Sequence, residues 1–269
     1  MSVPSGYWQD LTSEDFAGLD PERVVALLPV AAIEQHGPHL PLYTDTCICE
    51  GVVIRALELL PDEAALLVLP TLAVGDSTEH LGFPGTLSAT PETLIRFWRE
   101  VGDSVARAGV RKLVIFNSHG GQPQIVDIVA LELRRRHAML VVAASAYRFG
   151  VPAELFDDEE LTHGVHGGAV ETSMMLHLRP DLVRQEAAEN FEPMSLGMSG
   201  EYKHLSPTGR IRFAWCAEDL HPDGVAGDAT AADAEAGRRV VEHWARNLVE
   251  LVEETARFPL DLLRDTEDE

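Results

Sequence analysis

The sequence predicts an α/β protein whose central sheet is mostly parallel and is covered by helices. Two observations lead to this prediction. Short segments that are almost entirely apolar recur along the chain, and such segments are typical of strands buried on both faces of a parallel sheet. Segments with helical periodicity separate them. Alternation of this kind favours a layered α/β sandwich with right-handed crossovers.

Four segments are predicted strands, at residues 24–33, 65–74, 112–117 and 139–147. Each is rich in Val, Leu, Ile and Ala and carries no charge beyond its first position. In open parallel sheets, ligands bind outside the carboxyl ends of the strands. The residues that follow each strand are therefore the place to look for a functional site.

Helices are predicted at residues 45–60, from Thr90 to near Gly109, at 123–136 and at about 229–256. Thr90-Pro91-Glu92 combines an N-cap, a proline at the first helical position and an acid in the first turn. Gly109 is placed to end that helix. The basic triplet at 134–136 suits the C-terminus of the third helix, so it needs no nucleic-acid partner to explain it.

Length and composition fit one enzyme-sized domain. The chain has 269 residues, 45% of them hydrophobic, which is enough for a sizeable core. We expect a single domain over 1–269 that ends in an acidic tail at 264–269. Lys and Arg number 21 and Asp and Glu 44, so the formal charge is −23. Binding to nucleic acid needs a basic patch, and this composition argues against one.

The cysteines and the N-terminal residues indicate where the protein works. Cys47, Cys49 and Cys216 are too few and too irregularly spaced for a disulfide framework, and we expect all three to be packed thiols. The N-terminal residues lack the basic and apolar regions of a signal peptide. No stretch approaches the roughly 20 apolar residues of a membrane span. We therefore expect a cytoplasmic protein with no membrane partner.

The first predicted strand ends in two side chains that can bind a metal ion, Glu34 and His36. They are two residues apart, which places both on the same face of a strand. A Gly-Pro turn follows, and Asp45 then opens the next helix and returns to the same edge of the sheet. Taken alone, Asp45 is better explained as a helix cap, and Glu34-x-His36 is equally well explained as a solvated loop.

Two further clusters strengthen the metal interpretation. Ser118-His119-Gly120-Gly121 directly follows strand 112–117 and precedes a helix. Glycines let the backbone approach a ligand closely. Farther along, His163 and His166 precede glycines, and Glu171 lies early in a segment that is predicted to be helical. An acid in a first helical turn often only compensates the helix dipole, but here it comes with four other metal-binding side chains.

Together the clusters offer three carboxylates and two imidazoles, a set that suits Zn²⁺, Mn²⁺ or Fe²⁺. The proposed ligands are Glu34, His36, Asp45, His119 and Glu171. They are enough for two ions with one bridging carboxylate. The chain contains no G-x-S-x-G nucleophile motif, no Walker loop and no G-x-G-x-x-G after a strand, so neither a serine nucleophile nor a nucleotide cofactor is indicated.

These clusters resemble the motifs of the creatininase (creatinine amidohydrolase) family. The matching segments lie in the family's order and cover most of the chain: Glu34 to Leu42 with Asp45, Glu79-His80 to Ser88, Asn117 to Gly121, His166 to Ser173, and Gly224 to Asp228. The resemblance implies a three-layer α/β/α fold, assembly as a homo-oligomer, commonly a hexamer, and a site for two divalent metal ions. It also implies that the five proposed ligands hold these ions, with Asp45 as the bridging carboxylate.

Members of the family hydrolyse cyclic amides and formamides or process peptides, and some are thought to open carbocyclic or lactone-like rings. We therefore expect a metal-dependent amidohydrolase that acts on a small amide or formamide by attack of a metal-bridging hydroxide on the carbonyl. His166 and Glu171 are the expected catalytic residues, with His166 as a proton shuttle. The expected substrate contacts are Glu79, His80, Ser118, Gly120 and Gly121. A turn histidine at 166 and a salt-bridged loop at 79–80 are equally weighted alternatives.

The chain departs from creatininase itself at two positions. There the histidine corresponding to His119 is followed two positions later by a ligand glutamate, whereas this chain has Gly121, so Glu171 would supply the carboxylate. Many members read His-Gly-Gly-Asn where this chain has Gln122. These changes weaken the case for creatinine as substrate. Two alternatives stay open: a hydrolase that opens a carbocyclic or lactone ring, and a metal-binding accessory protein with little turnover.

Overall fold

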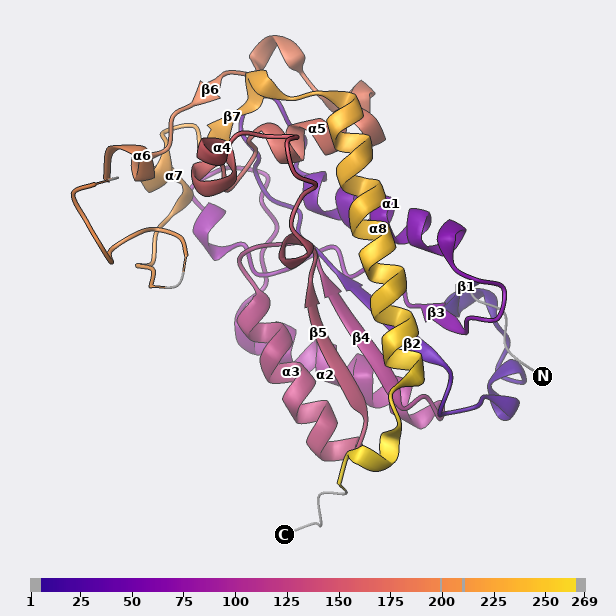
Figure 1. The fold of residues 1–269 in the computed structure, drawn as a ribbon. Helices are drawn as coiled ribbons and strands as arrows, with labels where there is room; N and C mark the ends of the chain where they lie inside the picture. Colours follow the sequence, from indigo (N-terminus) through magenta and orange to yellow (C-terminus); the bar gives the residue numbers. More distant parts are fainter. Residues whose placement is uncertain (1–5, 199, 210, 265–269) are drawn as a thin grey trace.

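The computed structural model describes residues 6–198, 200–209 and 211–264. Its centre is a sheet of five parallel strands in the order β1-β3-β2-β4-β5 (Figure 1). The strands are β1 (Gly6–Tyr7), β2 (Val25–Val30), β3 (Leu66–Val68), β4 (Lys112–Asn117) and β5 (Leu140–Ser145). β2 and β4 pair along their whole length, from Val25 opposite Lys112 to Val30 opposite Asn117. The carboxyl ends of these two central strands are therefore level.

Eight α-helices and a small antiparallel pair of strands complete the described elements. The helices are α1 (Thr44–Leu59), α2 (Pro91–Arg107), α3 (Pro123–His137), α4 (Asp158–His163), α5 (Ala169–Leu178), α6 (Met194–Met198), α7 (Ala217–Leu220) and α8 (Ala234–Arg257). The strands β6 (Asn190–Phe191) and β7 (Gly227–Asp228) pair beyond the carboxyl end of the main sheet. Among the described helices, none is long and apolar enough to cross a membrane.

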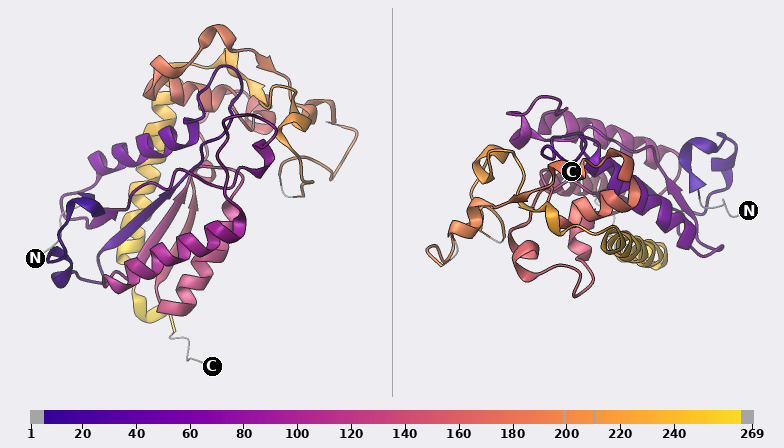
Figure 2. Two further views of the ribbon diagram at one scale, coloured as in Figure 1. Left: turned by 180° about the vertical axis from the view of Figure 1, so that it is seen from behind. Right: turned by 90° about the horizontal axis from the view of Figure 1, so that it is seen from above.

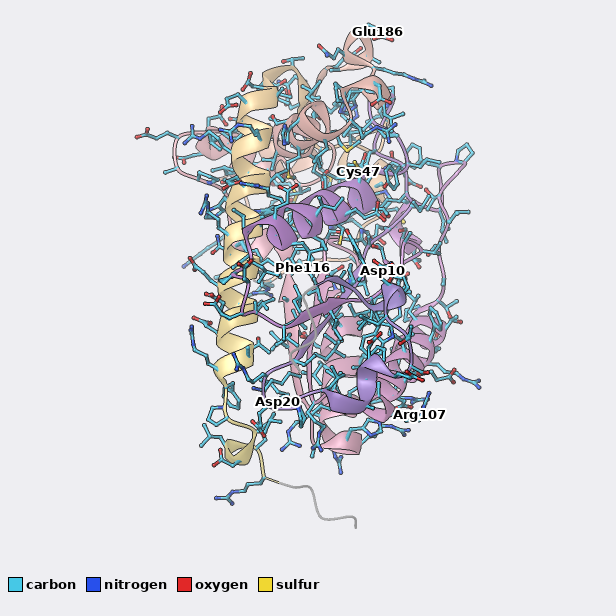
Figure 3. The ribbon with its side chains drawn as sticks, turned by 90° about the vertical axis from the view of Figure 1, so that its right-hand side faces the viewer. Asp10, Asp20, Cys47, Arg107, Phe116 and Glu186 are labelled. Carbon is cyan, nitrogen blue, oxygen red and sulfur yellow. The ribbon has the colours of Figure 1, made fainter. Side chains whose placement is uncertain are left out.

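The helices cover both faces of the sheet and form three layers, as the family resemblance implies. Alternate residues of β2 point to opposite faces, because successive side chains of a strand do so. Val25 and Leu27 join a core with α1, α5 and α8, whereas Ala26 and Leu28 join a core with α2 and α3. Figure 2 shows α2 and α3 on one side of the sheet and α8 on the other, and in Figure 3 the core residue Phe116 lies in the layer beside α1 and α8.

The four predicted strands are confirmed, with changes at their ends. The predicted strand at 65–74 is shorter, because only Leu66–Val68 keeps a regular ladder. The two central strands are buried at every residue, but β5 lies at the edge of the sheet and is mostly half-buried, so its apolar sequence overstated its burial. β1 was not predicted, because two residues leave no periodic pattern.

The predicted helices are also confirmed, and their caps explain their limits. The hydroxyl of Thr90 accepts a hydrogen bond from the backbone N–H of Thr93, as an N-cap does. Gly109 follows α2 with a φ of +88°, a left-handed conformation that favours glycine. The last helix begins at Ala234, later than predicted, because Asp233 is its N-cap and accepts from the N–H of Ala236.

The prediction for the cysteines was partly wrong. Cys47 and Cys49 are buried in α1, but Cys216 is exposed. Burial raises the pKa of the Cys47 thiol to about 11 and that of Cys49 to about 12, so both stay protonated at neutral pH. Cys216 begins the short helix α7, where its N–H donates to Asp219. Of the predicted acidic tail, only Arg264 lies within the described residues.

Candidate metal centre

The five proposed ligands lie together at the carboxyl edge of the sheet. Glu34 and His36 follow β2, His119 follows β4, and Asp45 stands in the first turn of α1. Glu171 lies in the first turn of α5. All five side chains are buried. The level ends of β2 and β4 bring the first two clusters together, and α5 adds the third from a distant part of the sequence.

The ligand atoms form two triads that share one carboxylate. In the first triad, Nδ1 of His119 lies 3.3 Å from Oε1 of Glu34 and 3.3 Å from Oδ2 of Asp45. In the second, Nε2 of His36 lies 3.7 Å from Oδ1 of Asp45 and 3.8 Å from Oε2 of Glu171. The three ligand atoms of each triad lie within 4.8 Å of one another. Asp45 therefore offers a different oxygen to each triad, as a carboxylate that bridged two ions would do.

Three buried atoms of these triads lack hydrogen-bond partners among the described residues: Oε2 of Glu34, Nε2 of His36 and Oδ2 of Asp45. A buried polar atom without a partner costs about 1–3 kcal/mol, and more when it is charged. Carboxylate oxygens and an imidazole nitrogen are the donors that Zn²⁺ and Mn²⁺ accept. The residues present therefore fit divalent metal ions, and the open lone pairs are those that such ions would use.

Backbone carbonyls orient the two ligand imidazoles. A carbonyl oxygen can only accept a hydrogen bond. Nδ1 of His36 lies 3.1 Å from the carbonyl oxygen of Glu34, and Nε2 of His119 lies 2.7 Å from that of Asp76. Each of these nitrogens must therefore carry the proton. The other nitrogen of each ring faces the carboxylates, and once deprotonated it could give its lone pair to a metal ion, as in most histidine metal sites.

Gln122, one of the departures from the family motif, holds this arrangement together. Its Nε2 donates to the side chain of Asn117 at 2.9 Å and to the carbonyl of Ala31 at 3.2 Å, and its Oε1 accepts from the N–H of Asp76. Asn117 in turn donates to the carbonyl of His119. Gln122 is fully buried. It therefore supports the proposed ligand His119 through Asn117 and is not exposed to a substrate.

Glu171 is held at both oxygens by groups that the sequence did not single out. The hydroxyl of Tyr147 donates to Oε1 at 2.7 Å, and the N–H of Gly167 donates to Oε2 at 2.6 Å. Tyr147 lies just beyond β5, in a single turn of 3₁₀ helix at Ala146–Phe149. Tyr147 is the last residue of the fourth predicted strand, and this position was the available signal, because that strand ends at the same edge as His119.

The carboxylates determine the charge state of the metal-free histidines. Burial disfavours the charged form of His36, but the carboxylates of Asp45, Glu171 and Glu34 outweigh it and raise its pKa to about 9. The pKa of His119 is raised as well: burial opposes the rise, but Glu34 and Asp45 outweigh it. Conversely, these imidazoles hold the pKa of Asp45 well below its usual range in spite of burial. Without metal, therefore, protons occupy nitrogens that a cation would need.

Two more imidazoles stack beside the ligands. The ring centre of His166 lies 4.1 Å from that of His36 and 4.3 Å from that of His80. Nε2 of His166 donates to the carbonyl of Gln35 at 2.7 Å, so Nδ1 keeps a lone pair, 3.8 Å from Oε1 of Glu34. Burial and the charge of His36 lower the pKa of His166 to about 4. His166 is thus a neutral base at the site, and Glu34, His36 and His166 form a third possible ligand group.

His80 was predicted to contact the substrate, and in the structure its imidazole lies against the proposed metal ligand Glu34. Its Nε2 lies 3.4 Å from Oε1 of Glu34, and its Nδ1 lies 2.8 Å from the side-chain nitrogen of Gln35. The Gln35 amide is fixed because it donates to the carbonyl of Gly224 and accepts from the N–H of Gly37. Its nitrogen therefore donates to Nδ1, and the Nε2 proton of His80 faces the carboxylate of Glu34.

The remaining predicted substrate contacts lie at different depths. Ser118 is buried, and its hydroxyl donates to the backbone carbonyl of Asp45 at 3.0 Å. Gly120 is exposed, with open space where a side chain would begin. A Cβ at Gly121 would lie 2.3 Å from Oε1 of Glu79, 2.5 Å from Nε2 of His119 and 2.9 Å from the carbonyl of Asp76. Glu79 is half-buried and lies against Gly121, next to His119. We call Glu79, Gly120 and Gly121 the lip of the site.

One valine fixes the two turns that carry His36 and His166. Gly37 and Gly167 have φ values of +75° and +66°, and each follows one of these histidines. A Cβ would lie 2.1 Å from a methyl carbon of Val225 at Gly37, and 2.9 Å from one at Gly167. Both the backbone conformation and the close contact thus require glycine. This gives a role to the 224–228 motif, which supplies no ligand.

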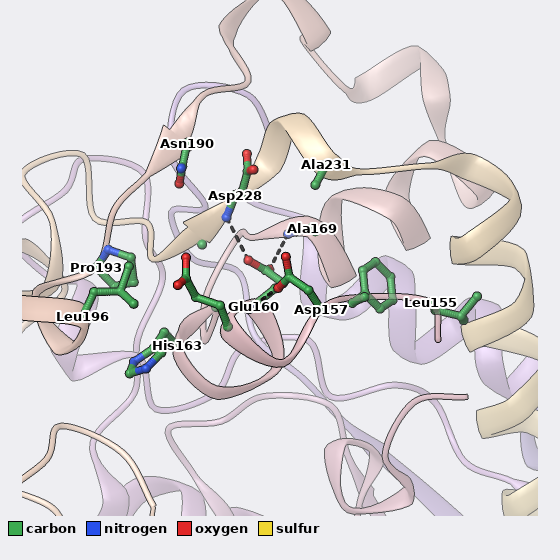
Figure 4. Close-up of a pocket in the computed structure, with 14 residues that line it drawn as sticks. Leu155, Asp157, Glu160, His163, Ala169, Asn190, Pro193, Leu196, Asp228 and Ala231 are labelled. Carbon is green, nitrogen blue, oxygen red and sulfur yellow. Dashed lines mark hydrogen bonds between the residues drawn. The ribbon is translucent and has the colours of Figure 1, made fainter. Parts of the chain in front are cut away.

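A hollow of about 160 Å³ lies behind the turn that leads to Glu171 (Figure 4). Glu160 forms its floor and accepts hydrogen bonds from the N–H groups of Ala169 and Asp228. His163, singled out in the sequence, lines this hollow and is hydrogen-bonded to Ser195 at 2.8 Å. His163 is therefore not brought to the metal ligands.

Comparison with known proteins agrees with this site. The family described as creatinine amidohydrolase matches residues 9–252. A mycofactocin precursor peptide peptidase of Mycolicibacterium smegmatis is 31% identical over 242 residues, 89% of this chain and 87% of that protein. A creatinine amidohydrolase of Pseudomonas putida is 34% identical over 69% of this chain and 75% of its own. A 3-dehydro-scyllo-inosose hydrolase of Thermotoga maritima is 27% identical over 99% of this chain and 89% of its own length.

Solved structures give the same result. A zinc–zinc form of a creatininase variant superposes with a TM-score of 0.76 at 26% identity, over 93% of this chain and 98% of that one. A manganese form of creatininase superposes with a TM-score of 0.70 at 26% identity, over 93% and 98%. These proteins share the fold of this chain over almost its whole length. The chain belongs to the creatininase family of hydrolases.

Proposed function

We propose that this chain is a hydrolase that uses two divalent metal ions to cleave the amide C–N bond of a small molecule or of a peptide end. The observation that carries the proposal is the pair of triads that share Asp45. The naming of relatives as a creatinine amidohydrolase and a peptide peptidase supports the choice of an amide.

Each residue has a defined part in this proposal. Glu34, Asp45 and His119 would hold one ion, and His36, Asp45 and Glu171 the other. Bound ions of this kind polarise a carbonyl and lower the pKa of a water molecule. The burial of all five side chains keeps bulk water from competing with these contacts.

His166 is placed to move the proton that hydrolysis requires. Cleavage adds a water oxygen to the carbonyl carbon, breaks the C–N bond and transfers a proton to the leaving nitrogen. Nδ1 of His166 carries a lone pair, because Nε2 donates to the Gln35 carbonyl. Its lowered pKa keeps it neutral and able to accept the proton of water. The ring of His36 packs against this base at an interplanar angle of 33°.

The substrate is proposed to enter beside the lip formed by Glu79, Gly120 and Gly121. The lip lies against His119, and Gly120 leaves open space above it. The Glu79 carboxylate, half-buried at this position, suits N–H groups of a substrate. Ser118, in contrast, is proposed to act from below by holding the backbone of Asp45.

A second candidate is hydrolytic opening of a carbocyclic or lactone ring. The similarity to an inosose hydrolase, over almost the whole chain, favours it. The same residues would serve, because only the carbonyl must be polarised. No nitrogen would leave, and His166 would then return its proton to carbon or to a ring oxygen. A homo-oligomer is proposed on the family resemblance alone, and a cytoplasmic location stays a prediction from the sequence.

A substrate panel on the metal-reconstituted protein tests these proposals. Metal per chain is measured by inductively coupled plasma mass spectrometry on protein without a histidine tag, and two ions are expected. Cyclic amides, formamides, short peptides, lactones and cyclic ketones are then assayed for released amine and for ring opening. Amine release supports the first proposal, and ring opening without amine supports the second. Fewer than one ion per chain, with no gain on added Mn²⁺ or Zn²⁺, would refute both.

A further inference from the structure

We propose that His39 is a positioning residue for Glu171 and acts through the backbone of Gly167. The inference rests on the proposed function, in which Glu171 is a metal ligand. His39 belongs to the first motif but is not one of the ligands. It is completely buried, three residues after His36. The structure shows what its imidazole contacts and why that contact matters for the carboxylate of Glu171.

The imidazole of His39 reaches across to the turn before α5. Its Nε2 lies 3.0 Å from the carbonyl oxygen of Gly167 and 3.0 Å from the hydroxyl of Thr172. The ring stacks on Phe191, with 5.3 Å between ring centres. The carbonyl can only accept, so Nε2 must carry the proton. Nδ1 has no hydrogen-bond partner among the described residues, so the neutral tautomer with the proton on Nε2 is the one that fits.

The two hydrogen bonds of Gly167 link His39 to the ligand. Its carbonyl accepts from His39, and its N–H donates to Oε2 of Glu171 at 2.6 Å. Only the φ and ψ torsions of Gly167 lie between these groups, and φ is +66°. Glycine has no steric preference that would hold this conformation. A hydrogen bond that holds the carbonyl therefore restricts this flexible residue, and with it the direction of the N–H that donates to Oε2.

Other groups also restrain this turn. Thr172 donates to the same Gly167 carbonyl, at 3.2 Å, but its hydroxyl belongs to the helix that carries Glu171. Glu160 holds the N–H of Ala169, two residues farther along (Figure 4), and Val225 packs against Gly167 without hydrogen bonding. His166, the residue before Gly167, donates to the carbonyl of Gln35. His39 is the donor that ties Gly167 itself to the loop of the first ligands.

Three substitutions separate the hydrogen bond from the presence of a ring. In His39→Gln the amide nitrogen stands the same number of bonds from Cα as Nε2 of histidine, so it can still donate to Gly167. In His39→Asn the amide nitrogen corresponds to Nδ1 and is too short to reach. His39→Leu removes the donor. Asparagine is thus a matched polar control for glutamine.

Two readouts are measured on each variant. The first is the Zn²⁺ affinity of each of the two sites, by competition with a chelator, with the metal count as a check. The second is the hydrogen-exchange rate of the Gly167 amide in metal-free, ¹⁵N-labelled protein. For His39→Leu and His39→Asn we expect about tenfold weaker binding of one ion and at least about tenfold faster exchange at Gly167, as for other groups that orient ligands. His39→Gln is expected to stay near wild type.

Equal effects of glutamine and asparagine on both readouts would overturn the proposal, as would unchanged exchange at Gly167 in His39→Leu. Equal weakening of both ions would also contradict it, because only one triad contains Glu171. If His39→Leu does not fold, the glutamine–asparagine comparison decides alone. A wild-type chain that binds no metal would refute the proposed function, while the exchange rates would still test the link from His39 to Gly167.

Discussion

Ionisable groups are buried at both ends of strand β4, but their hydrogen-bond partners differ. At the amino end Lys112 is completely buried, and its Nζ donates to the carbonyls of Glu22 at 2.6 Å and Ala256 at 2.7 Å. At the carboxyl end His119 faces Glu34 and Asp45, whose Oε2 and Oδ2 have no hydrogen-bond partner in the described structure. Lys112 has replaced water with protein acceptors, and so has Nε2 of His119, but the acids that face His119 keep oxygens without a partner among the described residues.

This difference separates a structural charge from a functional one. Burying an ionised group is unfavourable unless partners replace water. Lys112 joins the loop before β2 to the end of α8, and its partners are backbone carbonyls that need no further ligand. The acids at the carboxyl edge keep lone pairs open, which is favourable only if a cation takes them. Burial alone would not have distinguished the two ends, whereas the partners of each group do.

Asp45→Asn should have the largest effect, because Asp45 belongs to both triads. An amide offers one oxygen instead of two and carries no charge. We expect loss of both ions and a fall in kcat/KM of at least about a thousandfold, equivalent to several kcal/mol. Metal analysis and circular dichroism check this, with the exposed Asp62→Asn as control. Retention of two ions and full activity would show that Asp45 does not bridge.

Tyr147→Phe removes one of the two donors to Glu171 and leaves the ring against Trp244. Loss of a group that orients a ligand typically weakens metal binding or activity by about 10–100-fold. We expect an effect in this range on one ion, with the other retained. Stoichiometry and affinity for Zn²⁺ measure it. Equal loss of both ions would show that Tyr147 supports the whole edge of the sheet and not Glu171 alone.

The affinity of the site at the carboxyl end of β4 for metal ions should rise with pH. In the metal-free protein the pKa of His36 is about 9 and that of His119 is raised, so both hold protons at pH 7. A cation must displace these protons, so affinity is lost as pH falls and rises toward pH 9. The expected slope between pH 6 and 8 is about tenfold per unit for each proton released. Calorimetry in buffers of different ionisation enthalpy counts those protons, and a slope of zero would contradict protonated imidazoles at 36 and 119.

Lys112→Met should leave metal binding unchanged and lower stability. It removes a charged donor from two buried carbonyls, and the expected loss is about 2 kcal/mol in the free energy of unfolding. Urea unfolding of metal-free protein measures it, with the exposed Lys203→Met as the matched control. A change in metal affinity larger than about twofold would mean that the two ends of β4 are coupled.

The sequence was sufficient for the parts of the fold and site that depend on local pattern. Apolar runs identified β2 and β4, the latter with its correct ends, and the residues after them supplied Glu34, His36 and His119. The order of elements then gave the edge at which they meet. The burial of the edge strand β5 was overestimated, because an apolar sequence does not show how many strands lie beside it.

Contacts between distant segments could not be predicted from the sequence. Gln35 meets His80 and Gly224, which lie 45 and 189 residues farther along the chain, and no spacing in the sequence signals these pairs. The hydrogen bond from Tyr147 to Glu171 likewise depends on how α5 packs over the end of β5. The sequence could identify chemically suitable side chains, but only the fold separates ligands from the groups that orient them.

The tight surroundings of Gly121 have a consequence for evolution. A creatininase-like glutamate at this position would put its Cβ 2.9 Å from the carbonyl of Asp76 and 2.5 Å from the imidazole of His119. The carboxylate of Glu79 is mobile enough to yield, but the backbone is not. Any side chain at position 121 therefore requires the backbone near Asp76 or the imidazole of His119 to shift, and we expect a change at 121 to be accompanied by changes at 76–79.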